Sequence, residues 1–130
     1  MKTKTLKQKV FFKANPHDVY EALMDSKKHA QFTGAKASIS REVGREFTAY
    51  DGWILGKNIE LIPDKKIVQT WHGIDWPEGH YSTVTFLFKK IKAGTQLDFT
   101  HEGVPEEFYE DIKQGWFDHY WDKMKASFSW

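Results

Sequence analysis

The sequence predicts a single α+β domain covering residues 1–130, and three observations carry this prediction. A strand with one hydrophilic face is followed by two short helical segments, then by a series of strands separated by turns. The chain ends in one long helical segment rich in apolar residues. The sequence shows no internal repeat or interdomain linker, and 130 residues with a hydrophobic fraction of 40% suit one core.

The N-terminal segment predicts a strand and then two helices. Residues 5–13 alternate apolar residues with lysines, a pattern typical of a strand with one solvated face. Asn15 and Pro16 predict a helix start, because asparagine caps free backbone donors and proline suits the first helical position. Ser26 is expected to cap a second short helix that ends near Thr33 and Gly34.

The middle of the chain predicts an antiparallel meander, because short turn signals separate its apolar runs. Gly44, Asp51-Gly52, Pro63-Asp64 and Ala93-Gly94 mark turns, and residues 76–79 form a longer loop. The predicted strands are residues 37–41, 46–50, 53–62, 66–72, 81–91 and 95–103.

The last helix is predicted from Glu106 to Phe128, and at about 1.5 Å per residue it would span about 35 Å. Its apolar residues cover more than half of its circumference, whereas one core-facing stripe needs less. The helix is therefore either gripped on two sides or presents part of its surface to a cavity or a partner. Gly115 costs about 1 kcal/mol relative to alanine in a helix, which predicts close approach of another backbone there.

This order of elements is the helix-grip order, and four segments carry a resemblance to a known family. They are DGWILGKNIELIPDKKIVQTW, DWPEGHYSTVTF, THEGVPEE and QGWFDHYW. They resemble the activators of the heat-shock chaperone ATPase, within the START-like and birch-pollen-allergen-like helix-grip domains, and the resemblance extends over nearly the whole chain. It implies a curved antiparallel sheet wrapped around the C-terminal helix.

The resemblance also implies a function. In the eukaryotic co-chaperone of this family, a domain like this one is the second of two and contacts the nucleotide-binding region of the chaperone. The first domain and its ATPase-stimulating motif have no counterpart in these 130 residues. The resemblance implies a non-enzymatic, stress-related binding domain with a heat-shock chaperone as partner. The alternative is a carrier or sensor that holds a small apolar ligand in an internal cavity.

Composition argues against several other classes of protein. Net charge is +1 and the lysines are scattered, whereas nucleic-acid binding needs a concentrated basic face. The absence of cysteine excludes disulfides and thiolate metal sites. No apolar run could span a bilayer and the N-terminus lacks the apolar core of a signal peptide, so the predicted location is cytoplasmic.

The six histidines show no zinc-ligand spacing, so we predict no metal, no cofactor and no catalytic residue. His101 shares strand parity with Leu97 and Phe99 and should point inward. It is either a hydrogen-bonded core histidine or a polar anchor in an apolar pocket. No serine, cysteine or lysine is identifiably paired with it, so an enzyme of the wider START-like class lacks support.

Two sets of candidate binding residues follow. Trp53 follows a turn and Trp76 precedes a proline in a loop, so either they form a partner-binding surface or the loops fold their indoles underneath. The cavity candidates are inward-facing residues of the strands and the last helix: Phe47, Trp71, Val84, Phe86, Phe88, Leu97, Phe99, His101, Tyr109, Ile112, Trp116 and Tyr120. These side chains form either a packed core or the wall of a cavity.

Overall fold

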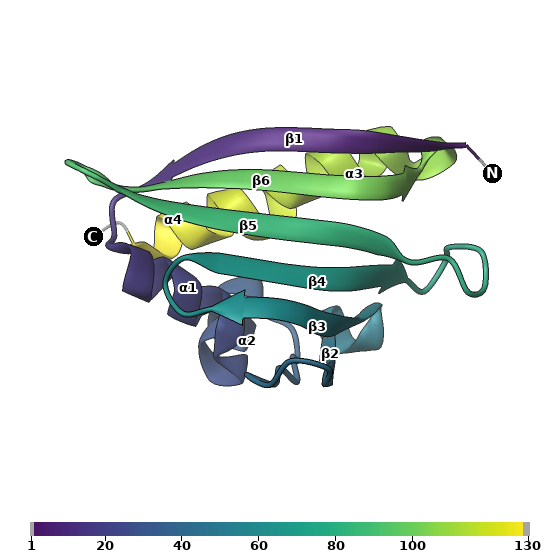
Figure 1. Cartoon of the computed structure of the whole chain (residues 1–130), viewed down its shortest axis with the longest axis horizontal. Coiled ribbons are helices and arrows are strands. Elements are labelled where there is room, and N and C mark those ends of the chain that lie inside the picture. The colour runs from purple at the N-terminus through teal and green to yellow at the C-terminus, as the bar shows by residue number, and fades with distance from the viewer. Residues whose placement is uncertain (1, 129–130) are drawn as a thin grey trace.

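The computed structural model describes residues 2–128, in which six strands form one antiparallel sheet. The strand order is β1-β6-β5-β4-β3-β2. Figure 1 shows a curved sheet with the C-terminal helix lying behind it and α1 and α2 beside that helix. The predicted helix-grip fold is confirmed. The strands are β1 (Thr3–Phe12), β2 (Glu46–Ala49), β3 (Ile54–Ile62), β4 (Lys66–Gly73), β5 (Ser82–Ile91) and β6 (Gly94–Pro105).

The two helices after β1 are α1 (Pro16–Met24) and α2 (Ser26–Thr33). The side chain of Asn15 accepts from the backbone N–H of Asp18, so the predicted cap of α1 is confirmed. The predicted cap of α2 is wrong, because Asp25 accepts from the N–H of Lys28. The hydroxyl of Ser26 instead accepts from the N–H of Ile39 at 2.8 Å and ties the following loop to α2.

The strand predicted over residues 37–41 is wrong. That segment makes one isolated bridge, between Ser38 and Thr48. The buried amide of Asn58 on β3 donates to the carbonyls of Ser40 (2.6 Å) and Glu42 (3.1 Å). Since a side chain satisfies these backbone groups, the segment follows the sheet edge as a loop.

The C-terminal helix runs from Glu106 to Phe128 but changes geometry along its length. A 3₁₀ turn (Glu106–Phe108) leads into α3 (Tyr109–Trp116), a π-helical turn (Phe117–Trp121) and α4 (Asp122–Phe128). Within the π turn the N–H of Asp122 bonds to the carbonyl of Phe117, five residues back. The rings of Trp116 and Trp121, also five apart, stack at 5.3 Å with 19° between their planes.

This wide turn explains the broad apolar surface of the helix. In a regular α-helix, residues five apart lie about 140° round the axis from each other. The π turn brings Trp116 and Trp121 to one side, and both are buried together with Tyr120 and Met124. Phe117 takes the outward position.

The core lies between the inner face of the sheet and this helix, with Trp116 at its centre. The Trp116 ring lies 4.4 Å from that of Phe99 and 4.8 Å from that of Trp71, centroid to centroid. Tyr109 and Ile112 pack against the same cluster at the start of the helix. None of the helices described in residues 2–128 combines the length and hydropathy needed to cross a bilayer.

Candidate functional site

A pocket of about 450 Å³ opens between the C-terminal helix and the turn that joins β2 to β3. Its wall is mostly aromatic and aliphatic. The helix contributes one face, β3 and β4 contribute Ile54 and Trp71, and the turn contributes the rim. The lining residues are Tyr50, Asp51, Trp53, Ile54, Trp71, Asp111, Ile112, Gly115, Trp116, His119 and Tyr120.

Gly115 keeps the helix side of the pocket open. The predicted close approach of another backbone is wrong, because a Cβ built on Gly115 would meet only the ring of His119, at 3.8 Å. Ile112 and His119, three residues before and four residues after Gly115, lie on the same face of the helix. The missing side chain therefore leaves space in the pocket.

The rim of the pocket is a strained 3₁₀ turn, Tyr50–Gly52. Tyr50 (φ 49°) and Asp51 (φ 57°) both have left-handed backbone, which costs on the order of 1 kcal/mol or more for a bulky residue such as tyrosine. Asp51 is held by Lys36, whose N–H donates to its carboxylate at 2.8 Å and whose carbonyl accepts its N–H at 3.0 Å. Backbone strain of this kind is typical of functional sites.

The hydroxyl of Tyr50 ties the rim to the helix by donating to the carbonyl of His119 in the π turn. A π turn disturbs the regular α-helical pairing of carbonyls, so an outside donor can satisfy one of them. Burial raises the pKa of Tyr50 and of Tyr120, so both phenols stay neutral at physiological pH.

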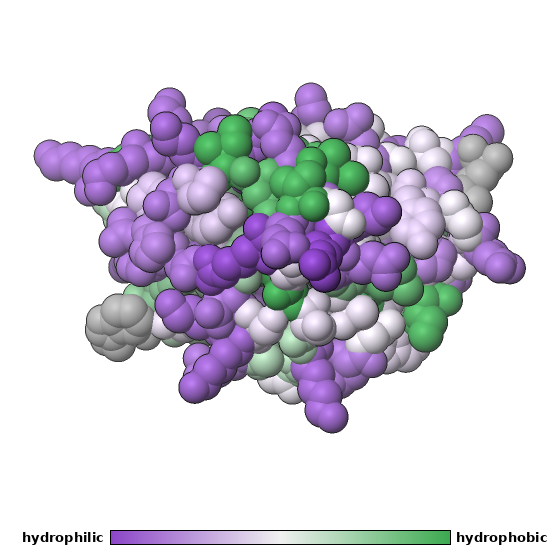
Figure 2. Space-filling view, turned by 60° about the horizontal axis from the view of Figure 1, so that its bottom comes forward, coloured by the Kyte–Doolittle hydropathy of each residue, from purple (hydrophilic) through white to green (hydrophobic). Residues whose placement is uncertain are grey.

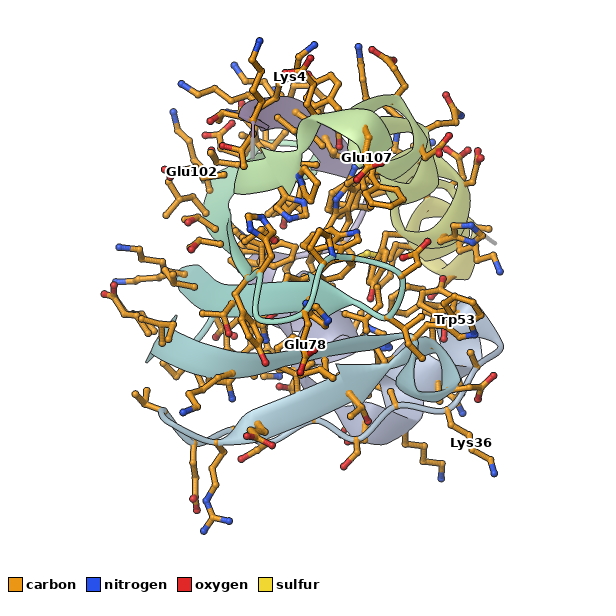
Figure 3. All side chains as sticks on the ribbon, turned by 90° about the vertical axis from the view of Figure 1, so that its right-hand side faces the viewer. Lys4, Lys36, Trp53, Glu78, Glu102 and Glu107 are labelled. Carbon is orange, nitrogen blue, oxygen red and sulfur yellow. The ribbon has the colours of Figure 1, made fainter. Side chains whose placement is uncertain are left out.

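Trp53 forms the exposed part of the rim, with 58% of its surface accessible. Its carbonyl accepts from the N–H of Ile74, another exposed apolar residue, at the start of the β4–β5 loop. Figure 3 looks at this end of the molecule and shows Trp53 at the margin below the helix. Figure 2 shows one face of the molecule, which is mainly hydrophilic and has its hydrophobic side chains in separate groups.

Four of the twelve cavity candidates line this pocket: Trp71, Ile112, Trp116 and Tyr120. The space left at the centre of the domain is only about 20 Å³, roughly room for one water molecule. A cavity walled by the middle of the sheet is therefore not what the structure shows. Seven of its predicted wall residues are buried in the packed core instead: Phe47, Val84, Phe86, Phe88, Leu97, Phe99 and His101. The eighth, Tyr109, is half-buried at the start of the helix.

His101 is a fully buried, hydrogen-bonded histidine. The indole N–H of Trp116 donates to its Nδ1 at 3.1 Å, so Nε2 carries the proton. Nε2 then donates to the hydroxyl of Ser82 at 2.7 Å, and Ser82 donates to the carbonyl of Trp71 at 3.3 Å. Burial lowers the pKa of His101 to about 3.

Ser82 is thus the partner of His101 that sequence analysis did not identify. The pair is not arranged as a nucleophile and its base, because Nε2 donates its proton toward the serine and cannot receive one. Both side chains are also buried away from the pocket. The contacts support the core-histidine interpretation of His101.

Trp76 is buried, so the predicted partner-binding surface of Trp53 and Trp76 is wrong for Trp76. Its accessible fraction is 5%, because the indole folds under its own loop against Gly73. A Cβ at Gly73 would lie 2.8 Å from the indole nitrogen, so only glycine leaves room for the ring. The ring also packs beside His72 and His80.

A second buried histidine lies at the other side of the core. His29 of α2 shares a hydrogen bond of 3.1 Å between its Nε2 and the hydroxyl of Tyr120. Within the described part of the chain its buried Nδ1 has no partner, and burial lowers the pKa of His29 to about 4. Among residues 2–128 no group of three or more His, Asp or Glu side chains gathers as a metal ion would require.

Several pocket residues were absent from the sequence candidates. Tyr50, Asp51 and Ile54 belong to a segment interpreted as a strand end and a hairpin turn. The available signal was Asp51-Gly52 beside exposed aromatics. Asp111, Gly115 and His119 could have been found from their helical spacing with Ile112, Trp116 and Tyr120.

Comparison with known proteins gives a consistent result. The family described as "Activator of Hsp90 ATPase homolog 1-like protein" matches residues 13–129. The chain is 36% identical over 129 residues to the activator of 90 kDa heat shock protein ATPase homolog of Dictyostelium discoideum, covering 98% of this chain and 34% of that one. Identity to homolog 1 of Homo sapiens is 32% over 119 residues, covering 92% and 35%.

The structure agrees with these sequence matches. It is similar to the crystal structure of an HSP90 activator from Plasmodium falciparum, with a TM-score of 0.85 and 27% identity over 96% of this chain and 94% of that one. The chain spans about a third of the length of the two curated relatives.

Proposed function

Because this chain belongs to the family of activator of Hsp90 ATPase homolog 1-like proteins, we propose that it binds a chaperone of the Hsp90 class through the open rim of its pocket. The observation that supports this most is the exposed indole of Trp53 on that rim. Tryptophan is enriched among the residues that dominate binding energy at protein interfaces. An Hsp90-class partner would also fit the predicted cytoplasmic location.

The rim suits a protein partner in two further respects. Its backbone is fixed in place by Lys36 and by the bond from Tyr50 to the helix, so binding would order few groups. The neighbouring Ile74 extends the apolar surface beyond Trp53. A rigid aromatic anchor with an apolar neighbour is typical of an interface centre.

The test compares Trp53→Ala with Phe11→Ala for binding to a purified Hsp90-class chaperone from the same genome. Phe11 is a matched control, because it is an aromatic residue 53% exposed on the edge strand β1. Trp53→Ala is expected to weaken binding about thirtyfold, the equivalent of about 2 kcal/mol, without lowering Tm. Equal effects of both variants, or no binding by the native protein at concentrations well above micromolar, would reject the proposal.

A second candidate function is carriage of a small apolar ligand, supported by the pocket volume. About 450 Å³ lies within the range of known small-molecule sites, and most of the lining is apolar. Gly115→Leu is the informative variant, since its side chain would fill the pocket and leucine favours helix over glycine.

Binding of the neutral dye N-phenyl-1-naphthylamine, followed by fluorescence, tests this second function. Saturable binding is expected for the native protein and not for Gly115→Leu, while Tm stays equal or rises. Phe11→Ala serves as the control that leaves the pocket unchanged. If Gly115→Leu still binds the dye, the dye-binding site lies outside this pocket, and the pocket no longer supports a carrier function.

A further inference from the structure

The pocket wall is aromatic and carries negative charge. Tyr50, Trp53, Trp71, Trp116 and Tyr120 supply its rings. Asp51, whose carboxylate accepts from the N–H of Lys36, and Asp111 are also lining residues, and no lysine or arginine of the described chain contributes to the lining. Aromatic faces and carboxylates both attract cations, the rings through the negative potential above their planes.

The surroundings of the pocket hold more acidic than basic residues, although Lys36 lies beside Asp51 and Lys4 lies over the ring of Tyr109. The β2–β3 turn (50–53), the β4–β5 loop (73–82) and the end of β6 with the first half of the helix (102–119) all lie at one end of the molecule (Figure 1). These segments hold nine of the chain's 18 acidic residues and one lysine, Lys113. Figure 3 shows Glu78, Glu102 and Glu107 on this same end with Trp53, together with Lys4 and Lys36.

We propose that the pocket receives a cationic side chain of the partner, a lysine or arginine flanked by apolar residues. This inference rests on the proposed function, because it names the chemistry of the partner segment. The charged head would lie against the rings of the wall and near Asp51 and Asp111, and the flanking apolar residues would cover Trp53 and Ile74. Charge complementarity distinguishes this occupant from an acidic or purely apolar segment.

The pocket is open to solvent on one side and is therefore only partly desolvated. Asp51 and Asp111 are exposed, so they need no internal counter-ion. A cation that enters leaves bulk water for a site with two carboxylates and several rings. Cation–aromatic attraction strengthens when the cation is partly desolvated in this way.

A small probe tests the chemistry of the pocket without the chaperone. Benzamidinium, benzamide and benzoate have nearly the same shape and differ in charge, so binding of each is measured by titration calorimetry and tryptophan fluorescence. We expect benzamidinium to bind with a Kd on the order of millimolar, as suits so small a ligand, and benzoate not to bind. Benzamide should bind several-fold more weakly than benzamidinium.

Variants on the helix assign the effect to the pocket. Asp111→Asn should weaken benzamidinium binding about fivefold, whereas Glu110→Gln, which changes the neighbouring acid outside the lining, should have little effect. Gly115→Leu should abolish binding of both benzamidinium and benzamide. Equal affinity for benzamidinium and benzamide, or equal effects of the two charge variants, would overturn the inference.

The chaperone experiment separates this inference from the proposed function. If the Hsp90-class chaperone binds and Asp111→Asn weakens it while Glu110→Gln does not, both are supported. If the chaperone binds but benzamidinium shows no preference, only the inference fails. If benzamidinium is preferred but no chaperone binds, the proposed function fails and the cation preference of the pocket stands. Self-association of the chain that Asp111→Asn abolishes would make a second copy the occupant and overturn the assignment to a chaperone.

Discussion

At the scale of single residues, Trp116 connects the parts of the core. Its ring packs on Phe99 and Trp71 of the sheet and on Trp121 of the helix, and its N–H donates to His101. Trp116→Ala is expected to lower the free energy of unfolding by about 3–5 kcal/mol, as for other large buried aromatics. Urea denaturation followed by circular dichroism measures this loss.

Trp116→Phe is the control that separates packing from hydrogen bonding. It keeps most of the ring contacts but leaves Nδ1 of His101 without its donor, which should cost about 1–3 kcal/mol. A loss for Trp116→Phe as large as that for Trp116→Ala would show that the polar contact outweighs the packing. Unchanged stability of Trp116→Ala would remove Trp116 from the centre of the core.

The two buried histidines make stability depend on pH. Their pKa values in the folded protein, about 3 for His101 and about 4 for His29, lie below the ordinary value near 6.5 that applies in the unfolded chain. Below about pH 6.5 the unfolded chain binds protons that the folded protein does not. The contribution of the two histidines to the free energy of unfolding is therefore fully present above about pH 6.5. As the pH falls from 6.5 to about 4, this contribution decreases by about 1.4 kcal/mol per pH unit for each histidine.

Denaturation midpoints between pH 7.5 and 4.5 measure this slope. His101→Gln should reduce the slope contributed by the histidines by about half, whatever its effect on absolute stability. His17→Gln is the control, because His17 is exposed and pairs with Asp64 at the surface. A stability that is flat between pH 7 and 5 would contradict the inferred protonation states.

Residue positions were predictable where a regular strand or helix fixed them. The inward direction of Phe99 and His101 followed from alternation along one strand. The partner of His101 did not, because Ser82 lies on a neighbouring strand whose register one sequence does not specify. Trp76 was ambiguous because a loop has no periodicity that tells which way an indole points.

At the scale of elements, the sequence predicted the order of elements and missed their irregular parts. Six of the seven predicted strands are present, and the exception, residues 37–41, is a loop because Asn58 binds its carbonyls. That contact joins residues 16 and 18 positions apart and leaves no local pattern. The π turn was also missed, because turn signals mark where a helix ends and not where it widens.

The loop over residues 34–45 should therefore depend on Asn58. Asn58→Ala removes two donors to backbone carbonyls and the acceptor of a 3.0 Å bond from Gln69, all buried or half-buried. We expect a loss of about 2–4 kcal/mol in the free energy of unfolding, since each buried partner left unsatisfied costs about 1–3 kcal/mol. Thermal unfolding measures the loss of global stability, and limited proteolysis measures the local loosening of the loop.

Ser40→Ala is the matched control for this variant. Asn58 contacts the carbonyl of Ser40, which the substitution keeps, while the hydroxyl accepts only from the N–H of Glu42 within the loop. Ser40→Ala should change Tm little. Faster proteolysis of the loop in Asn58→Ala than in Ser40→Ala is the expected difference, and equal rates would show that Asn58 does not hold the loop.

At the scale of the whole molecule, charge is divided between the two ends of the sheet. The pocket end is acidic, and the opposite end carries Lys65-Lys66 and Lys89-Lys90 at its hairpins (Figure 1). The sequence alone shows a nearly neutral chain with scattered lysines. The division becomes visible only once the antiparallel order brings alternate turns to the same end.

This division predicts salt-dependent association with a basic partner segment. The association rate for the Hsp90-class chaperone should fall about tenfold between 50 and 500 mM salt, because screening removes long-range attraction. Glu102→Lys with Glu107→Lys should slow association at low salt. Stopped-flow fluorescence measures these rates.

The opposite end provides the control. The ten residues of β5 span about 33 Å, roughly three screening lengths at 0.1 M salt, so Lys89→Glu with Lys90→Glu should leave the rate nearly unchanged. An association rate independent of salt would show that the acidic end does not steer the partner. Equal effects of the two double variants would show that only net charge matters.

The π turn also restricts how the length of this chain can change. Deleting one residue between Phe117 and Trp121 would leave Trp116 and Trp121 four apart, a spacing that a regular α-helix already brings to one side. Inserting one residue there would instead rotate α4 by about 100° relative to α3, so that either Trp116 or Trp121 would leave the core and Met124 would move with α4. A surface loop tolerates insertion and deletion, whereas here one codon determines which side of the last helix faces the sheet.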